Sequence, residues 1–198
     1  MSGPGVAIAI LAAGRGSRLG DAVKPLARLH DRPLVSWALD AAVASGLHPV
    51  WLVTGYEGRH VAAAAPQGVD VVHNRHWRAG IASSLRTALG AIAPYAEVSA
   101  VCIGLADQPR VGPEAYRRLA AAHADGAQLA VATYAGVRGN PVLLARSLWA
   151  EANELEGDVG ARRLMQRHDV VEVPCEDTGS AVDVDTAEDL EQLNEEPQ

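Results

Sequence analysis

The chain lacks several features that would define a protein class at once. It has 198 residues without a single phenylalanine, and aromatic side chains make up only 4% of it. Ala, Val and Leu must therefore fill the core that a chain of this length can bury. Basic residues are also scarce, with 17 Lys and Arg against 24 Asp and Glu and a formal net charge of −7. This balance argues against nucleic acid as a partner, because non-specific binding to phosphates requires a basic surface.

Cysteines and long apolar runs are equally scarce. The chain contains only Cys102 and Cys175, which are too few for a disulfide framework and lack the spacing of a zinc site. No apolar run reaches the ~20 residues that a membrane span requires. The opening segment MSGPG has no basic residues, so it does not read as a signal peptide. We therefore expect no membrane association, a cytoplasmic location, and a single domain over 1–198 with its core at about 6–193.

Short apolar runs alternate with helical patterns along the whole chain. Strands are expected at 6–11, 49–54, 69–73, 98–105, 129–134, 142–144, 170–173 and 181–184. Helices are expected at 33–45 with Asp31 as N-cap, and at 57–65, 79–92, 113–124, 158–168 and 186–194. Buried strands that alternate with helices predict an α/β fold, with a mostly parallel sheet covered on both faces.

The segment LAAGRGSRLGDAVKPL, residues 11–26, directly follows the first apolar strand. A glycine-rich loop exposes successive backbone N–H groups that bind a polyphosphate, and Arg15, Arg18 and Lys24 add positive charge. The loop contains neither GxxxxGK[ST] nor GxGxxG. Its spacing alone is therefore also compatible with a tight strand-to-helix turn that needs positive φ.

Polar residues follow the next three strands at the same edge of the predicted sheet. Thr54, Asn74 and Asp107 each come at or just after the end of an apolar run, and ligands of such sheets bind beyond the carboxyl ends of the strands. Asp107 suits a magnesium site, since Mg²⁺ takes one or two carboxylates together with substrate phosphates. An Asp shortly before Pro109 is also typical of a turn or a helix cap.

A second source of carboxylates lies in SAVDVDTAEDL, residues 180–190. Asp183 and Asp185 alternate with valines, so both side chains would project from one face of a short strand. We assign Asp183 to the metal and Asp185 to capping of the last helix. Thr186 is the alternative cap, with Asp189 or Glu188 in the first turn.

These motifs together resemble a known family. The glycine loop with Lys24 is followed by N-x-x-W-x-x-G-x-x-S-S at 74–84, L-A-D-Q-P at 105–109, G-D-x-G-A-R at 157–162 and D-V-D-T-x-E-D-L at 183–190. In this order they resemble the molybdopterin nucleotidyltransferases, most closely the branch that attaches CMP to molybdopterin. The resemblance covers nearly the whole chain. It implies a single Rossmann-like, three-layer domain of the nucleotide-diphospho-sugar transferase type.

The resemblance also implies substrates, a cofactor and site residues. An NMP, with CMP from CTP as the first expectation, would pass to a phosphorylated acceptor, molybdopterin, with Mg²⁺ as cofactor and release of pyrophosphate. The acceptor phosphate is largely dianionic at neutral pH because its second pKa is about 6, so no protein base is needed. A molybdoenzyme or a chaperone would be the protein partner. The implied residues are Lys24, Arg18 and Asp107 for catalysis; Leu11, Ala12, Ala13, Gly14, Arg15, Gly16, Lys24, Asn74, Gly80 and Ser84 for the nucleotide; Asn140, Pro141, Asp158 and Arg162 for the acceptor; and Asp107 and Asp183 for the metal.

Two departures from the family pattern fall on the acceptor side. The G-H-P common in this branch reads Gly139-Asn140-Pro141, and G-D-K-G reads Gly157-Asp158-Val159-Gly160. GMP transfer, another small phosphate acceptor and an NAD(P)H-dependent oxidoreductase on the same fold therefore stay open. Against the oxidoreductase, Thr54-Gly55-Tyr56 replaces the acidic ribose clamp that is expected after the second strand. Trp77 in the second motif can stack on a base or anchor a loop.

Overall fold

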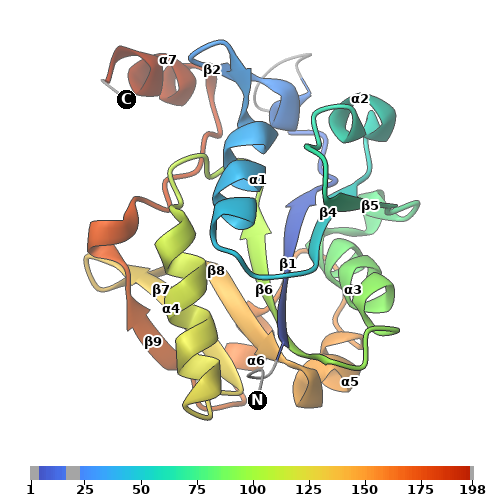
Figure 1. Cartoon of the computed structure of the whole chain (residues 1–198). Coiled ribbons are helices and arrows are strands. Elements are labelled where there is room, and N and C mark those ends of the chain that lie inside the picture. The colour runs from blue at the N-terminus through green and yellow to red at the C-terminus, as the bar shows by residue number, and fades with distance from the viewer. Residues whose placement is uncertain (1–4, 17–22, 197–198) are drawn as a thin grey trace.

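The computed structural model describes residues 5–16 and 23–196. Its centre is a seven-stranded sheet in the order β5-β4-β1-β6-β8-β7-β9 (Figure 1). The strands are β1 (Gly5–Ala12), β4 (Val50–Thr54), β5 (Val69–His73), β6 (Val98–Leu105), β7 (Leu129–Tyr134), β8 (Val137–Ala145) and β9 (Val171–Pro174). β8 pairs antiparallel with both of its neighbours, and the other strand pairs of this sheet are parallel. The predicted α/β class with a mostly parallel sheet is confirmed.

Helices cover both faces of this sheet. They are α1 (Leu34–Ala44), α2 (Gly58–Ala62), α3 (Ile81–Ile92), α4 (Pro113–Ala124), α5 (Trp149–Ala152), α6 (Arg162–Met165) and α7 (Ala187–Glu195). Ile8 and Ile10 of β1 belong to the core layer under α1 and α4, whereas Ala9 and Leu11 belong to the layer under α3. Successive strand residues point to opposite faces, so a doubly covered strand reads as an unbroken apolar run. Among the described helices, none combines the length and apolarity needed to span a membrane.

The helix before β4 shows one wrong prediction. α1 has Pro33 rather than Asp31 as its N-cap residue. Asp31 instead lies in the turn of a small hairpin, where His30 and Asp31 have φ of 47° and 62° between β2 (Arg28–Leu29) and β3 (Arg32–Pro33). Two central residues with positive φ are typical of a two-residue hairpin turn, and Asp tolerates that conformation better than most residues.

Two further predictions near the C-terminal end need correction. The helix expected at 158–168 shrinks to α6, which covers only Arg162–Met165. The segment 181–184 is not a strand, because it runs across the end of the sheet rather than alongside an edge strand. Val184 N donates a hydrogen bond to Asp107 O at 2.9 Å, which anchors the backbone of this segment. That bond places the acidic segment directly beside the loop that follows β6.

Candidate functional site

A cavity of about 200 Å³ lies where β1 and β6 end. The glycine loop and the loop after β6 form its wall, with Leu11, Ala12, Gly14, Gly16, Lys24, Pro25, Ala106 and Asp107 as lining residues. Gly16 has φ of 67° and packs directly against the Lys24 side chain. A side chain at position 16 would collide with Lys24, so glycine here allows the loop to close on the lysine.

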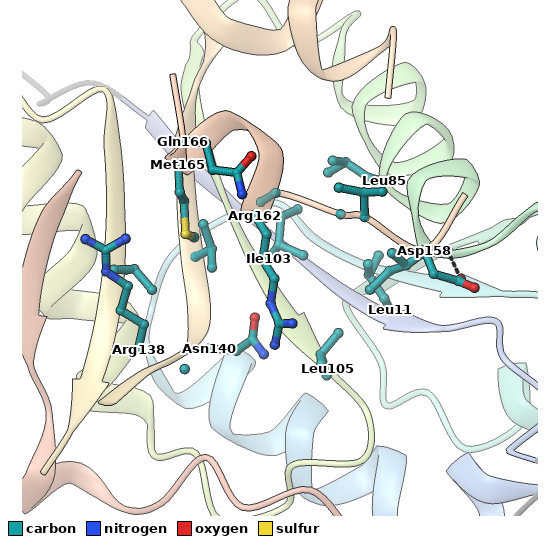
Figure 2. A pocket seen from close by; sticks show the side chains of 17 residues that line it. Leu11, Leu85, Ile103, Leu105, Arg138, Asn140, Asp158, Arg162, Met165 and Gln166 are labelled. Carbon is teal, nitrogen blue, oxygen red and sulfur yellow. Dashed lines mark hydrogen bonds between the residues drawn. The ribbon is translucent and has the colours of Figure 1, made fainter. Parts of the chain in front are cut away.

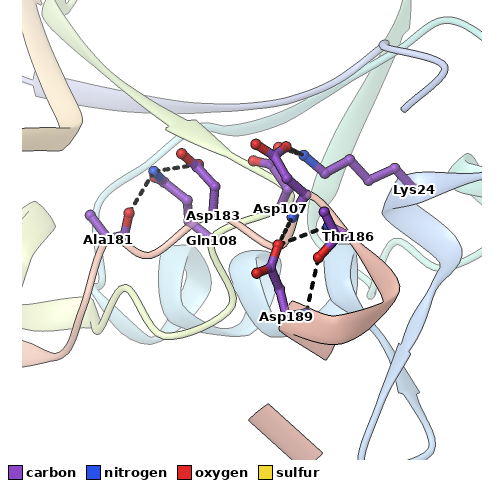
Figure 3. Close-up of polar contacts among 8 residues, drawn as sticks. Lys24, Asp107, Gln108, Ala181, Asp183, Thr186 and Asp189 are labelled. Atoms are coloured by element: carbon purple, nitrogen blue, oxygen red, sulfur yellow. Dashed lines mark hydrogen bonds and ion pairs between the residues drawn. The ribbon is translucent and has the colours of Figure 1, made fainter. Parts of the chain in front are cut away.

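Lys24 is held between two carboxylates in this cavity (Figure 3). Its Nζ donates to Asp107 Oδ2 at 2.5 Å and to Asp185 Oδ1 at 2.6 Å. Burial of the ammonium lowers the pKa of Lys24, but the charge of Asp107 and the hydrogen bonds to both carboxylates outweigh burial, so the pKa of Lys24 is raised. Lys24 is therefore a permanent cation near neutral pH.

The capping role proposed for Asp185 is wrong. Thr186 is the N-cap of α7, and its hydroxyl accepts from Asp189 N while the Asp189 carboxylate accepts from Thr186 N in a capping box. The Asp185 side chain does not cap the helix and instead binds Lys24. The assignment of Asp183 to a metal stays a prediction.

Asp183 lies beside this pair and is oriented by a buried amide (Figure 3). Gln108 Nε2 donates to Asp183 Oδ1 at 2.9 Å and to Ala181 O at 3.1 Å. Gln108 is only 3% exposed, and its Oε1 has no hydrogen-bond partner among the described residues. Burial and the negative charge of Asp107 raise the pKa of Asp183, although the bond from Gln108 opposes them. Gln108 thus fixes the direction of one of the three carboxylates.

These carboxylates suit a divalent cation that arrives with phosphates. Asp107 and Asp185 already surround one cation, the Lys24 ammonium, with oxygen ligands. In the described part of the chain, however, no cluster of three His, Cys, Asp or Glu side chains forms a complete metal site. Mg²⁺ normally completes its shell with water and substrate phosphates and takes one or two protein carboxylates. The residues present fit that requirement.

A second cavity of about 550 Å³ adjoins the first (Figure 2). Its apolar lining comprises Leu11, Ile81, Leu85, Ile103, Leu105, Val131, Val142 and Met165. Its polar lining comprises Arg138, Asn140, Asp158, Arg162 and Gln166. Leu11 lines both cavities, so the two share a wall at the end of β1. A ligand in one cavity would meet a ligand in the other at this residue.

Two arginines line the larger cavity, Arg138 from β8 and Arg162 from α6 (Figure 2). Arg162 of α6 has no carboxylate within ion-pair distance among the described residues, whereas Arg138 Nε bonds to Glu172 Oε1 at 2.7 Å. Arg138 was missed by the sequence analysis. The period of two along β8 was the available signal, because it places Arg138 on the same side as Asn140. Pro141 does not line the cavity, whereas Asn140 does.

The residues predicted to lie near the base form mainly internal contacts. Asn74 is 1% exposed, and its Nδ2 donates to Ser83 Oγ at 2.8 Å and Ser84 Oγ at 3.0 Å. Its Oδ1 accepts from His76 N at 2.9 Å. Asn74, Gly80 and Ser84 line neither cavity. The structure thus gives the Asn74 side chain a role in shaping the loop after β5.

The loop at 157–160, which was predicted to face the acceptor, is anchored to the start of α3. Asp158 Oδ1 accepts from Ile81 N at 3.2 Å, and Gly157 O accepts from Ala82 N at 3.1 Å. Gly80 leaves room for this contact, since a Cβ at position 80 would lie 2.6 Å from Asp158 Oδ1. Gly80, predicted near the base, thus joins the two sides of the site. Arg18 lies outside the described residues.

Comparisons with known proteins agree with this geometry. The model of the MobA-like NTP transferase domain matches residues 8–173. The chain belongs to this family. Among curated proteins, this chain is similar to nicotine blue oxidoreductase of Paenarthrobacter nicotinovorans, at 32% identity over 96% of this chain and 97% of that protein.

Solved structures have the same fold. Rv0371c from Mycobacterium tuberculosis H37Rv matches with a TM-score of 0.84 and 31% identity, over 99% of this chain and all of that one. A complex of Rv0371c with manganese matches with a TM-score of 0.81 and 30% identity, over 98% and 100% of the two chains. Molybdopterin-guanine dinucleotide biosynthesis protein A from Archaeoglobus fulgidus has a TM-score of 0.73 over 96% and 97% of the chains, and at 18% identity it supports the fold alone. This chain is therefore a nucleotidyltransferase-type α/β protein of the MobA-like family.

Proposed function

We propose that this family member transfers CMP from CTP to the terminal phosphate of molybdopterin and releases pyrophosphate. The observation that carries the proposal is the pair of adjoining cavities. One holds the glycine loop, Lys24 and Asp107, and the other is larger and mainly apolar, with an Arg162 that has no carboxylate partner among the described residues. A transferase that joins two substrates needs two such sites, with the reacting phosphates at their common wall, here Leu11.

The chemistry requires positioning and charge neutralisation. An oxygen of the acceptor phosphate attacks the α-phosphorus of CTP, a new P–O bond forms, and the bond from the α-phosphorus to the bridging oxygen breaks as pyrophosphate departs. Backbone N–H groups of the glycine loop and the Lys24 ammonium bind the triphosphate and offset its charge. Arg162 holds the acceptor at the far side. None of these residues needs to accept a proton from the dianionic acceptor.

A divalent cation, which we expect to be Mg²⁺, would neutralise phosphate charge when bound. Asp107 with Asp183 or Asp185 would hold it, since these carboxylates converge at the end of β6. The manganese complex of Rv0371c is consistent with a divalent ion in a relative of this chain.

The test is transfer of label from α-³²P-CTP to molybdopterin with Mg²⁺, run beside GTP and beside NADH oxidation with an aromatic acceptor. Label from CTP on molybdopterin, together with release of unlabelled pyrophosphate, supports the proposal. Label from GTP alone would replace CMP by GMP as the transferred group. NADH oxidation without any nucleotidyl transfer would overturn the proposal and favour an activity like that named for the nicotine blue relative.

Matched variants sharpen the assignment. We expect Lys24→Met to abolish transfer, whereas Arg28→Met should keep it, because Arg28 is exposed and donates to Asp31 O in the hairpin. On α6, Arg162→Gln should raise the KM for the acceptor roughly tenfold, the loss expected for one charge-assisted contact. Arg163→Gln should not, since the neighbouring Arg163 does not line the cavity.

A further inference from the structure

Two arginines and two aromatic rings contact one another in a row beside the glycine loop. The Arg15 guanidinium lies 5.5 Å from the centroid of the Tyr56 ring, and Tyr56 packs on Trp77 with centroids 5.5 Å apart. Arg78 covers the next ring, 4.3 Å from the centroid of Trp77. Trp77 therefore has neighbours in the protein for its ring, which favours the anchoring role over base stacking.

The backbone fixes Tyr56 against the loop. Tyr56 N donates to Ala13 O at 3.0 Å. Gly55 before it leaves no space for a side chain, because a Cβ there would lie 2.5 Å from Ala13 O and 2.7 Å from Trp77 Cβ. Glu57 after it is held at φ of 49°, an unfavourable conformation for a residue with a Cβ. These backbone contacts fix the position of the Tyr56 ring independently of the exposed Arg15 side chain.

Arg15 has no carboxylate within ion-pair distance in the described part of the chain, so the Tyr56 ring is the recorded partner that restrains its charge. Arg15 also does not line the small cavity that holds Lys24 and Asp107. Its guanidinium therefore belongs to the outer rim of the loop. If the α-phosphate lies beside Leu11, as the proposed function requires, the outer rim is the side of the loop left for the two outer phosphates.

We infer that Tyr56 is a positioning residue for nucleotide binding, whose ring presents the Arg15 guanidinium to the two outer phosphates of the triphosphate. The inference rests on the proposed function, because it requires a nucleoside triphosphate in the small cavity with its α-phosphate at the wall with the second cavity. It adds a residue outside the family motifs quoted above. It also distinguishes phosphate recognition from base recognition, since neither Tyr56 nor Arg15 need touch the base.

The experiment uses calorimetry in the presence of Mg²⁺ to measure the Kd of CTP, of GTP and of CMP. It compares the full wild-type chain with three single variants. Because an exposed cation–π contact restrains Arg15 only weakly, Tyr56→Leu should raise the Kd for the bound triphosphate about two- to fivefold. Tyr56→Phe, which keeps the ring, should match the wild type. Arg15→Gln should raise the Kd at least as much as Tyr56→Leu. The Kd for CMP, which lacks the outer phosphates, should stay constant in all variants.

A double variant separates positioning from simple support of the loop. Arg15→Gln combined with Tyr56→Leu should bind no more weakly than Arg15→Gln alone, because the ring then has no guanidinium to hold. An unchanged or tighter Kd in Tyr56→Leu, an additive double variant, or a parallel loss of CMP binding would overturn the inference while leaving the proposed function intact. A wild-type chain that binds neither triphosphate would overturn both.

Discussion

Gly55 is the point at which the strand β4, the glycine loop and Trp77 meet, and Gly55→Ala is a severe test of that packing. The added Cβ would lie 2.5 Å from Ala13 O, 2.7 Å from Trp77 Cβ and 2.8 Å from Ala13 Cβ. All three distances fall below the 3.4 Å at which ordinary van der Waals contact begins. Two of the atoms belong to the main chain or first side-chain carbon of the loop, so the loop itself must move.

Overpacking of this kind typically lowers the free energy of unfolding by about 1–3 kcal/mol. For a chain of this size each kcal/mol corresponds to roughly 2–4 °C in melting temperature. Gly90 provides the matched control, because it lies on the exposed side of α3 with no atom within 4 Å of an added Cβ. The same change there should raise the free energy of unfolding by about 0.5–1 kcal/mol through helix propensity.

Urea denaturation of the two variants decides the matter, and their midpoints should move in opposite directions. Displacement of Ala13 should also reduce the thermal stabilisation that a bound triphosphate gives to Gly55→Ala, while Gly90→Ala should keep it in full. A Gly55→Ala protein with the midpoint of the wild type would refute the close packing of the loop on β4.

Three other predictions concern the C-terminal region and the lysine. Thr186→Ala should lower the free energy of unfolding by about 1 kcal/mol in urea denaturation, because α7 loses its N-cap; an unchanged midpoint would contradict the capping box. The hydrogen bond from Arg118 lowers the pKa of Asp177 below 3.8. Its stabilisation is therefore fully present above pH 3.8 and is lost as the pH falls through the lower folded pKa. The stability difference between wild type and Asp177→Asn should shrink in acid unfolding, and a constant difference would exclude the pair. Lys24→Met removes the ammonium that binds both Asp107 and Asp185, so Mn²⁺ should raise its melting temperature more than that of the wild type. Equal shifts in melting temperature would show that the Lys24 ammonium does not occupy the binding site of the divalent cation.

Much of the fold could be predicted because the sheet is buried on both faces. β5, β6 and β7 have the predicted bounds, and so does α4, which starts at a proline suited to a first turn. The short α6 could not be predicted, because its periodicity continues beyond the point where tertiary packing ends the helix. The 181–184 segment has the alternation of a strand but no neighbouring strand with which to pair, and pairing is a property of the whole sheet.

The candidate site was predictable in its residues and less so in its contacts. Strand ends indicated that Lys24 and Asp107 would approach each other, because parallel strands bring their carboxyl ends to one edge. The role of Asp185 depended on whether Asp185 or Thr186 is the N-cap of α7. The sequence at 183–189 is compatible with either residue as the cap. The Tyr56–Arg15 contact joins residues far apart in the chain with no motif between them. Only the three-dimensional packing of β4 on the loop reveals it.

The reversed direction of β8 has a consequence for how this scaffold can diversify. Because β8 runs against its neighbours, its beginning rather than its end lies at the ligand edge, and the hairpin that joins it to β7 opens there too. Lengthening or shortening that hairpin would reshape the mouth of the larger cavity around Asn140 without changing the register of any strand beneath it. Under the proposed function, acceptor recognition and structural integrity would therefore depend on separate parts of one strand, so loop variation could change the acceptor while the donor side stays as it is.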